Sequence, residues 1–249
     1  MKNLTLIIII LFMSANLFAS GGGAHLESAQ TNIRSNDSLV NGAKLYMNYC
    51  SGCHSLQYQR YSRMAADLGL SKDEVTESLI LTGAKFSSHM TKTMDDAQAK
   101  EKGWFNNAYP KDLTLVAKSR GNDWLFTYLK SFYKDSSKST GWNNTLFPDV
   151  SMPNVLWELQ GIQQASFDEH EDEHGIVSHT FTGFENITEG NLSHEEFDTA
   201  VRDIVNFLAY TAEPAQLIRL AYAPWVLLFL VVFTFLAFML KKNYFKDIH

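Results

Sequence analysis

Cysteine and basic charge are both scarce in this sequence. Only 2 of the 249 residues are cysteine, so this chain alone cannot supply the four thiolates of a Cys₄ zinc site. Lys and Arg together number 21 against 27 Asp and Glu, which gives a formal net charge of −6. A surface that binds nucleic acid needs an excess of basic side chains, so we expect no nucleic-acid partner. Internal repeats are also absent.

Both cysteines lie in one pentapeptide, CSGCH, at residues 50–54. This C-x-x-C-H pattern is typical of the attachment site of a c-type haem. On a helix, Cys50 and Cys53 share a face, so each thiol can form a thioether with one porphyrin vinyl group, and His54 can ligate the iron. A thioredoxin-like redox pair and half of a zinc site are the alternatives. Residues 41–49 predict a helix rather than a strand before the motif, which disfavours the redox pair.

A second axial ligand must reach the iron from the face opposite His54. Met152 is a candidate because it lies far downstream and precedes Pro153, and a residue before proline is pushed toward extended geometry. His89 and Met90, in a polar segment, remain alternatives at this point. A His/Met pair favours Fe(II) and leaves no open position on the iron, so the sequence indicates a one-electron carrier.

The N-terminus has the features of an export signal. A charged start is followed by a short apolar run over residues 4–13 and by small residues near Ala19 and Ser20. The apolar run is too short to span a bilayer, which needs about 20 residues. We therefore predict a cleaved signal over residues 1–20.

A second apolar segment lies near the C-terminus. Residues 221–240 carry no charge, and 20 helical residues at 1.5 Å each match the roughly 30 Å hydrocarbon core of a bilayer. Lys241 and Lys242 follow it, which predicts a cytoplasmic C-terminus by the positive-inside rule. The expected organisation is an exported domain over 21–213 and a membrane anchor with a short tail over 214–249.

The exported part predicts mostly helices. Ser71 with Glu74, and Ser193 with Glu196, have the spacing of capping boxes, which mark helix starts. The residues between the predicted elements are polar, and we expect a loop at 134–145. Helices are expected at 39–53, 71–81, 95–102, 122–132 and 193–208, with a short one after Pro153, and a small hairpin is expected at 176–188.

Four segments, in this order and followed by one anchor, resemble cytochrome c1, the haem subunit of the bc1 complex (ubiquinol–cytochrome c reductase), in its proteobacterial form. The resemblance runs from about Leu39 to the C-terminus. It implies a mostly α, class I cytochrome c-like haem domain with insertions, plus one C-terminal transmembrane helix. The segments are GAKLYMNYCSGCHSLQYQRY, NNAYPKDLTLVAKSRGNDWLF, PDVSMPNVLWELQG and FDTAVRDIVNFLAYTAEP.

The resemblance also implies roles for single residues. It assigns the sixth iron ligand to Met152, and it implies one haem c bound through two thioethers. It implies that Arg120 lies beside a haem propionate, where charge-assisted hydrogen bonds would hold the carboxylate, and that Pro110 packs near the haem. The family often has tyrosine where this chain has Trp124, so a tyrosine contact to the propionate is not expected here.

The function implied by the resemblance is electron transfer from the Rieske iron–sulfur protein to cytochrome c. The terminal helix would then pack beside cytochrome b and membrane lipid in the bacterial inner membrane, with the haem domain in the periplasm. Catalysis would belong to the complex. Three alternatives stay open: a free-standing membrane-anchored cytochrome feeding a terminal oxidase, a haem-based gas sensor, and a thiol oxidoreductase that uses Cys50 and Cys53.

Acidic side chains are concentrated in residues 161–201, which contain ten Asp or Glu and no Lys or Arg. The simplest interpretation is a mobile, solvated loop. His170 and His174 are four residues apart among carboxylates, so a metal site is a second interpretation. A third follows from the family, in which acidic surface steers a basic cytochrome c into place.

Overall fold

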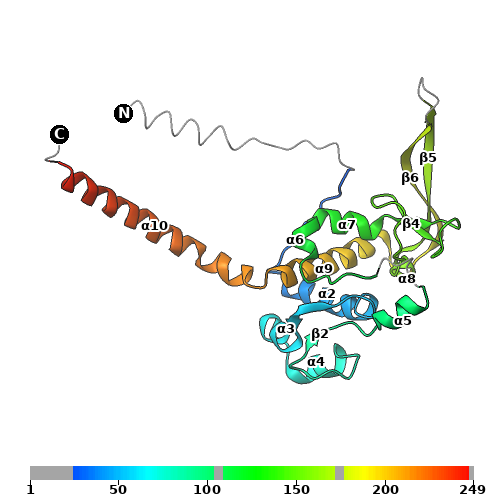
Figure 1. Ribbon diagram of the computed structural model, residues 1–249, viewed down its shortest axis with the longest axis horizontal. Coiled ribbons are helices and arrows are strands. Elements are labelled where there is room, and N and C mark those ends of the chain that lie inside the picture. Colours follow the sequence, from blue (N-terminus) through cyan, green and yellow to red (C-terminus); the bar gives the residue numbers. More distant parts are fainter. Residues whose placement is uncertain (1–24, 104–108, 172–176, 247–249) are drawn as a thin grey trace.

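The computed structural model describes residues 25–103, 109–171 and 177–246. About half of the chain is helical, and two elements project from the globular part: the helix α10 and the two-stranded ribbon β5–β6 (Figure 1). The predicted export signal at 1–20 lies outside the described residues, so it stays a prediction.

The elements follow one another in a mostly helical order with three separate two-stranded antiparallel sheets, β1–β2, β3–β4 and β5–β6. The helices are α2 (Asn36–Tyr49), α3 (Tyr61–Leu68), α4 (Lys72–Ser78), α5 (Asp96–Glu101), α6 (Val116–Arg120), α7 (Asn122–Lys130), α8 (Trp157–Gln160), α9 (His194–Ala212) and α10 (Gln216–Tyr244). The strands are β1 (Leu56–Arg60), β2 (His89–Met90), β3 (Phe132–Lys134), β4 (Trp142–Asn144), β5 (Gly161–Glu171) and β6 (Val177–Glu189).

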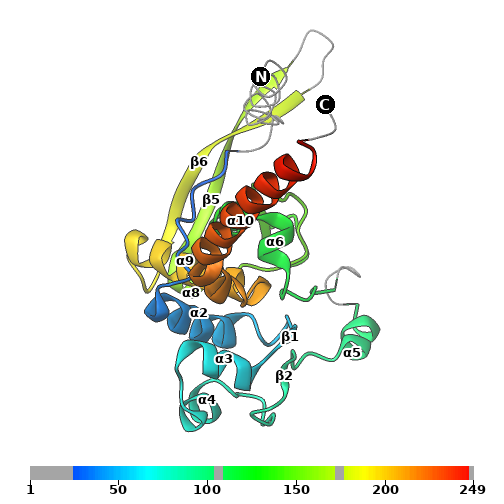
Figure 2. The same ribbon diagram turned by 90° about the vertical axis from the view of Figure 1, so that its left-hand side faces the viewer.

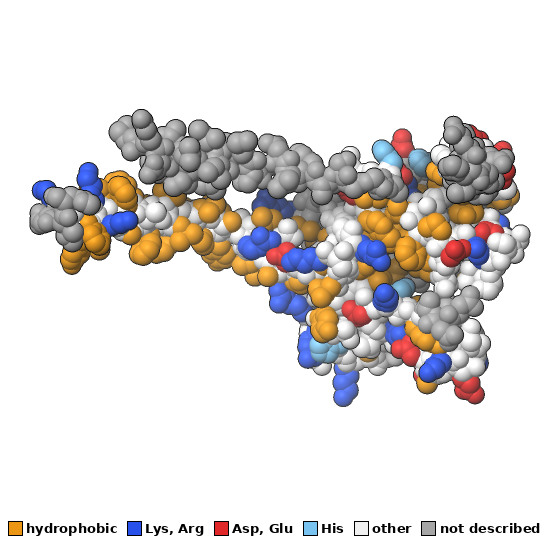
Figure 3. Space-filling view, turned by 45° about the horizontal axis from the view of Figure 1, so that its top comes forward, with side chains coloured by type: hydrophobic (Ala, Val, Ile, Leu, Met, Phe, Trp, Pro, Cys, Tyr) orange, Lys and Arg blue, Asp and Glu red, His pale blue; other side chains and the backbone are white. Residues whose placement is uncertain are grey.

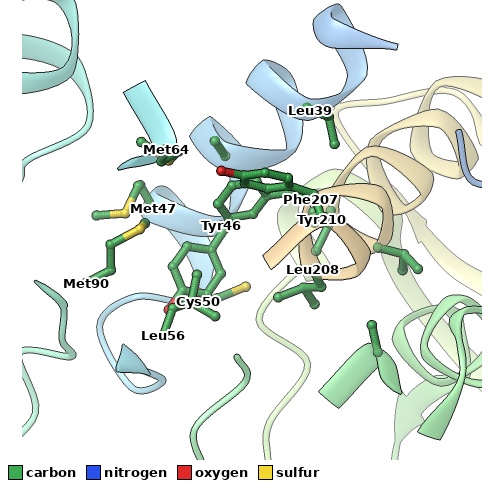
Figure 4. Packing of buried hydrophobic residues seen from close by; sticks show 14 of the residues in the cluster. Leu39, Tyr46, Met47, Cys50, Leu56, Met64, Met90, Phe207, Leu208 and Tyr210 are labelled. Atoms are coloured by element: carbon green, nitrogen blue, oxygen red, sulfur yellow. The ribbon is translucent and has the colours of Figure 1, made fainter. Parts of the chain in front are cut away.

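The centre of the fold is the crossing of α2 and α9. Gly42 makes the close approach possible, because a Cβ atom built on it would lie 2.0 Å from the carbonyl oxygen of Asp203. One turn later on α2, the ring of Tyr46 packs against Phe207 of α9 with 5.7 Å between ring centroids (Figure 4). The first and last helices of the globular part therefore share one hydrophobic core.

Two helix starts follow the predicted capping boxes. The side chain of Ser71 accepts a hydrogen bond from the backbone N–H of Glu74 at the start of α4, and Ser193 does the same with Glu196 at the start of α9. Each glutamate carboxylate in turn accepts from the backbone N–H of its serine. These pairs satisfy N–H groups that a helix start leaves without partners.

The predicted helix at 39–53 ends earlier than expected, at Tyr49. The N–H groups of Cys50 and Ser51 both donate to the carbonyl of Tyr46, and the Ser51 hydroxyl donates to the carbonyl of Met47. These bonds satisfy the last carbonyls of α2 and stop the helix. The haem motif therefore occupies the turn that follows α2, and the prediction that it continues the helix is wrong.

The prediction of a mobile loop across the acidic stretch is also wrong for most of its length. β5 pairs with β6 from Gly161–Glu189 to Glu171–Val177, so the small hairpin expected at 176–188 is half of a much longer ribbon. Three aromatic rings hold it together: Phe167 lies 5.9 Å from Phe181, which lies 4.7 Å from Phe184. The Phe167–Phe181 pair joins β5 to β6, and cross-strand aromatic pairs stabilise two-stranded sheets; Phe181 and Phe184 are both on β6.

Two smaller predictions also differ from the structure. The expected loop at 134–145 overlaps the short hairpin β3–β4, which begins at Phe132 and in which Phe132 pairs with Asn144. The short helix expected to have Pro153 in its first turn begins only at Trp157. Residues 153–156 form neither helix nor strand.

The anchor prediction is confirmed by α10. This helix has 29 residues and is long and apolar enough to cross a membrane, and none of its most apolar window is buried in the globular part. Hydrophobic side chains cover the visible side of α10, with lysines toward its far end (Figure 3). Glu213, between α9 and α10, pairs with Lys118 of α6 at 2.9 Å and with Arg219 of α10 at 2.8 Å.

Candidate cofactor site

The C-x-x-C-H turn is held in place by its own backbone and by two segments that come later in the sequence. Its own backbone closes with a hydrogen bond of 2.9 Å from the N–H of His54 to the carbonyl of Cys50. The carbonyl of Gly52 accepts from the N–H of Met94 at 3.0 Å, and the carbonyl of Ser55 accepts from the N–H of Leu113 at 2.9 Å. Two segments that are distant in sequence thus fix the turn in place.

The imidazole of His54 is oriented by a backbone carbonyl. Its Nδ1 lies 2.7 Å from the carbonyl oxygen of Lys111, and a carbonyl can only accept, so Nδ1 carries the proton. Nε2 is then left with a free lone pair, the form in which histidine ligates a metal. Burial lowers the pKa of His54, which also favours the neutral ring. The half-buried Pro110 immediately precedes Lys111, so this predicted residue belongs to the segment that orients the ligand.

The two thiols are unpaired; Cys50 is buried in the hydrophobic core, and Cys53 is half-buried. Burial raises the pKa of Cys50 to about 12 and also raises the pKa of Cys53. Cys50 lies in the core near Leu56 and Met47 (Figure 4). A thiol oxidoreductase needs the opposite environment, one that lowers the pKa of its attacking cysteine. The raised pKa values of Cys50 and Cys53 therefore disfavour a thiol oxidoreductase.

Of the candidates for the second ligand, Met152 is half-buried and Met90 is not accessible. Met90 is 2% exposed and fills the core beside Met47 and Met64 (Figure 4). The sulfur of Met152 accepts a hydrogen bond from the hydroxyl of Tyr128 at 3.5 Å. His89 is half-buried, and its Nδ1 has no hydrogen-bond partner among the described residues, so it remains an alternative on geometry.

The segment that carries Met152 is braced by a buried amide. Asn144, 0% exposed, donates from Nδ2 to the carbonyl of Tyr128 at 2.9 Å. Its Oδ1 accepts from the N–H groups of Leu146 and Phe147. Asn144 therefore ties the end of α7 to the chain leading to Met152.

Arg120 stands at the end of α6 with its guanidinium over two rings. Its Cζ lies 5.0 Å from the centroid of Trp124 and 5.9 Å from that of Phe147. The side chain is exposed, and no carboxylate among the described residues forms an ion pair with it. Such a guanidinium is suited to bind a carboxylate from outside the chain, as the predicted propionate contact requires.

One hydrophobic cluster lies beside several of these groups. Cys50 belongs to it, and Leu113, Trp124 and Tyr128 pack against it. Figure 3 shows a hollow on the globular part in which hydrophobic side chains gather. Two unpaired thiols, an imidazole with a free Nε2, a thioether and an uncompensated guanidinium are the donors that a haem c needs, so the residues fit this group.

Sequence reasoning missed three residues of this site: Lys111, Tyr128 and Asn144. Lys111 acts through its carbonyl, which no side-chain motif reveals. Tyr128 was expected only as one residue of the helix predicted at 122–132. Asn144 was expected only as a loop residue. The predicted metal site at His170 and His174 cannot be placed, because residue 174 lies outside the described residues.

Comparison with known proteins gives a consistent family. A model described as the Cytochrome C1 family matches residues 31–175, which include the C-x-x-C-H motif, Arg120 and Met152. A protein of Allochromatium vinosum, "Cytochrome c1", is 48% identical over 249 residues, covering all of both chains. A protein of Nitrosomonas europaea, "Ammonia monooxygenase gamma subunit", is 37% identical over 247 residues, covering 98% of this chain and 97% of that protein.

Proposed function

The chain belongs to the cytochrome c1 family, and from this premise we propose that it is the electron-transfer subunit of a quinol–cytochrome c reductase of the bc1 type. In this role it accepts single electrons from the Rieske iron–sulfur protein and passes them to cytochrome c. The observation that carries the proposal is the orientation of His54, whose Nδ1 is committed to the carbonyl of Lys111 and whose Nε2 is free.

Different residues of the site would hold different parts of the cofactor. Cys50 and Cys53 would attach it covalently, and His54 and Met152 would bind its iron. A haem held in this way supplies a one-electron Fe(III)/Fe(II) couple. With His54 and Met152 both bound to the iron, no position would be left for oxygen or a substrate. This set of ligands supports electron transfer and disfavours a gas sensor.

The proposed topology places the globular part in the periplasm. Lys241 and Lys242 at the far end of α10 favour the cytoplasmic side by the positive-inside rule. The exposed apolar surface of α10 would pack against cytochrome b and lipid. The two ion pairs of Glu213 tie the start of α10 to α6, which would hold the cofactor site at the membrane surface.

Purification from the native membrane tests this proposal. We expect the chain to copurify in mild detergent with cytochrome b and a Rieske protein, and to keep a haem stain after denaturing electrophoresis, because thioethers survive denaturation. Isolation without those two subunits would favour the free-standing cytochrome. Copurification with subunits of a monooxygenase would instead favour the assembly named for the Nitrosomonas europaea relative. Loss of the stain on denaturation would contradict covalent attachment.

The acidic ribbon is the proposed docking surface for the electron acceptor. Asp168 and Glu169 are exposed on β5, and Glu185 is exposed on β6. Opposed charges accelerate association of two proteins, and salt screens the effect. The exposed rings of Phe167 and Phe181 lie close to these carboxylates in sequence and share the ribbon.

Neutralising the ribbon should weaken this steering. For Asp168→Asn with Glu169→Gln, we expect cytochrome c reduction by the complex at low salt to slow by roughly threefold and its salt dependence to flatten. The matched control is Asp73→Asn with Glu77→Gln on α4, which lies at the end of the globular part opposite the ribbon (Figures 1 and 2). An unchanged salt dependence in the ribbon variant, or an equal change in the control, would contradict docking at the ribbon.

A further inference from the structure

We infer that Tyr128 positions the sulfur of Met152 and, by donating a hydrogen bond to it, raises the one-electron potential of the centre. The inference rests on the proposed function. The observation that carries it is the contact of 3.5 Å between the Tyr128 hydroxyl and the Met152 Sδ. This is the only hydrogen bond found for the Tyr128 hydroxyl within the described residues.

The direction of this hydroxyl is set by packing on both sides of its ring. Trp124 stacks on Tyr128 with 4.9 Å between centroids and an interplanar angle of 11°. Phe132 meets the same ring edge-on at 5.1 Å and 69°. A ring held in this way cannot swing its hydroxyl away without losing both contacts, so the bond to Met152 is built into the packing.

The backbone around Tyr128 is tied to the same segment as Met152. Asn144 donates to the Tyr128 carbonyl and accepts from two N–H groups of the chain that leads to Met152. Asp149, in that chain, donates its N–H to the Oδ1 of the buried Asn143 at 2.9 Å. Donor and acceptor therefore belong to one hydrogen-bonded unit, and their distance does not depend on a mobile surface loop.

The chemistry of a thioether gives the bond its effect. The sulfur has two lone pairs, so one can bind iron while the other accepts a hydrogen bond. The hydroxyl draws electron density from the sulfur and weakens its donation to the iron. Fe(III) needs that donation more than Fe(II) does, so the bond favours the reduced state. Hydrogen bonding around a ligand is one of the levers by which proteins tune a metal centre.

The stack continues from Tyr128 to Arg120. Trp124 and Tyr128 are four residues apart on α7, which places them on one face of the helix, and the guanidinium of Arg120 lies over Trp124. One row of contacts thus runs from Arg120, the residue expected at a propionate, through Trp124 and Tyr128 to Met152, the residue expected at the iron. Trp124 and Phe132 both contact the ring of Tyr128.

Tyr128→Phe tests the inference, because it removes the hydroxyl and keeps the ring. In the full-length, haem-loaded protein in detergent, we expect a redox titration to show a two- to fivefold shift of the Fe(II)/Fe(III) ratio toward Fe(III) at fixed potential. For a one-electron couple this is a fall of about 20 to 40 mV. The sulfur-to-iron charge-transfer band of the oxidised protein should remain. Tyr244→Phe, which removes an exposed hydroxyl at the end of α10, should leave the potential unchanged.

Met152→Leu separates failure of the inference from failure of the ligand assignment. If Met152→Leu abolishes the charge-transfer band but Tyr128→Phe leaves the potential unchanged, Tyr128 does not tune the centre and the ligand assignment stands. If Tyr128→Phe itself abolishes the band, its role is structural and the inference is wrong. If Met152→Leu leaves the band intact, both the ligand assignment and the inference fail. Adding Tyr128→Phe to Met152→Leu should cause no further shift, because the acceptor is already gone.

Discussion

Met152→Leu is expected to lower the potential of the centre sharply and to open its iron to carbon monoxide. Leucine keeps the apolar volume of methionine but has no atom that can bind a metal. A hundredfold loss of preference for Fe(II) would lower the potential by about 120 mV, well within the range of roughly 0.8 V that axial ligands control. The measurements are a redox titration and the reduced spectrum under carbon monoxide, both on the full-length protein.

Met90→Leu is the matched control. Met90 is buried with Met47 and Met64 and serves as core filler, so the substitution should change neither the potential nor the binding of carbon monoxide. An unchanged potential in Met152→Leu would reject Met152 as the ligand. In that case His89, whose Nδ1 lacks a partner among the described residues, would be the next candidate.

Gly42→Ala is expected to have the largest effect on stability. The added Cβ would lie 2.0 Å from the carbonyl oxygen of Asp203, 2.7 Å from its carbonyl carbon and 2.8 Å from the Cβ of Phe207. Two of these atoms are backbone of α9 and cannot rotate away, so the helices must separate. We expect a loss of about 3 kcal/mol, which for a chain of this size lowers the melting temperature by roughly 6 to 12 °C. Thermal unfolding of the haem-loaded protein measures it.

Gly183→Ala provides the comparison for this prediction. A Cβ at Gly183 meets no atom within 4 Å, and this glycine does not have a positive φ. The same change of one methyl group should therefore leave the melting temperature nearly unchanged. Equal stability of the Gly42 and Gly183 variants would show that α2 and α9 can separate freely at their crossing, contrary to the packing described above.

The Gly42→Ala substitution is also expected to affect the cofactor site, because α2 leads directly into the attachment turn. Tyr46 packs against Phe207 at the crossing, and its hydroxyl donates to the carbonyl of His54 at 2.6 Å. Cys50 follows the last residue of the same helix. A shift of α2 would therefore be transmitted to the attachment turn. We expect Gly42→Ala to broaden or shift the potential as well as to lower the melting temperature.

Features that depend on local chemistry were predictable. The capping boxes of α4 and α9 need only two side chains three residues apart, and both are present in the structure. The anchor needs only length and an absence of charge, and α10 meets both conditions. The family resemblance was equally accessible, because it depends on the order and spacing of several segments, and the match over residues 31–175 confirms it.

The errors concern a helix end and a pairing between two strands, neither of which a hydrophobic or charge pattern specifies. The end of α2 is set by bonds from Cys50 and Ser51 to Tyr46, which a helical pattern does not reveal. The ribbon was not predicted because its acidic residues, among them Asp168 and Glu169, indicated a solvated loop. The aromatic pair Phe167–Phe181, by contrast, forms only when both strands are in place. For the ribbon the deciding partner lies on the other strand, whereas for α2 it is the carbonyl of Tyr46 within the same helix.

The sequence by itself determined the C-x-x-C-H motif and the single apolar helix that can span a membrane, and it predicted which atoms would bind a cofactor: two thiols, one imidazole and one thioether. Those properties belong to individual side chains and to short spacings. Only the tertiary structure decided how these atoms are aimed. The carbonyl of Lys111 leaves Nε2 of His54 free, and the packed ring of Tyr128 directs a hydroxyl at Met152. Orientation depends on groups brought together from distant parts of the chain, and only folding brings them together.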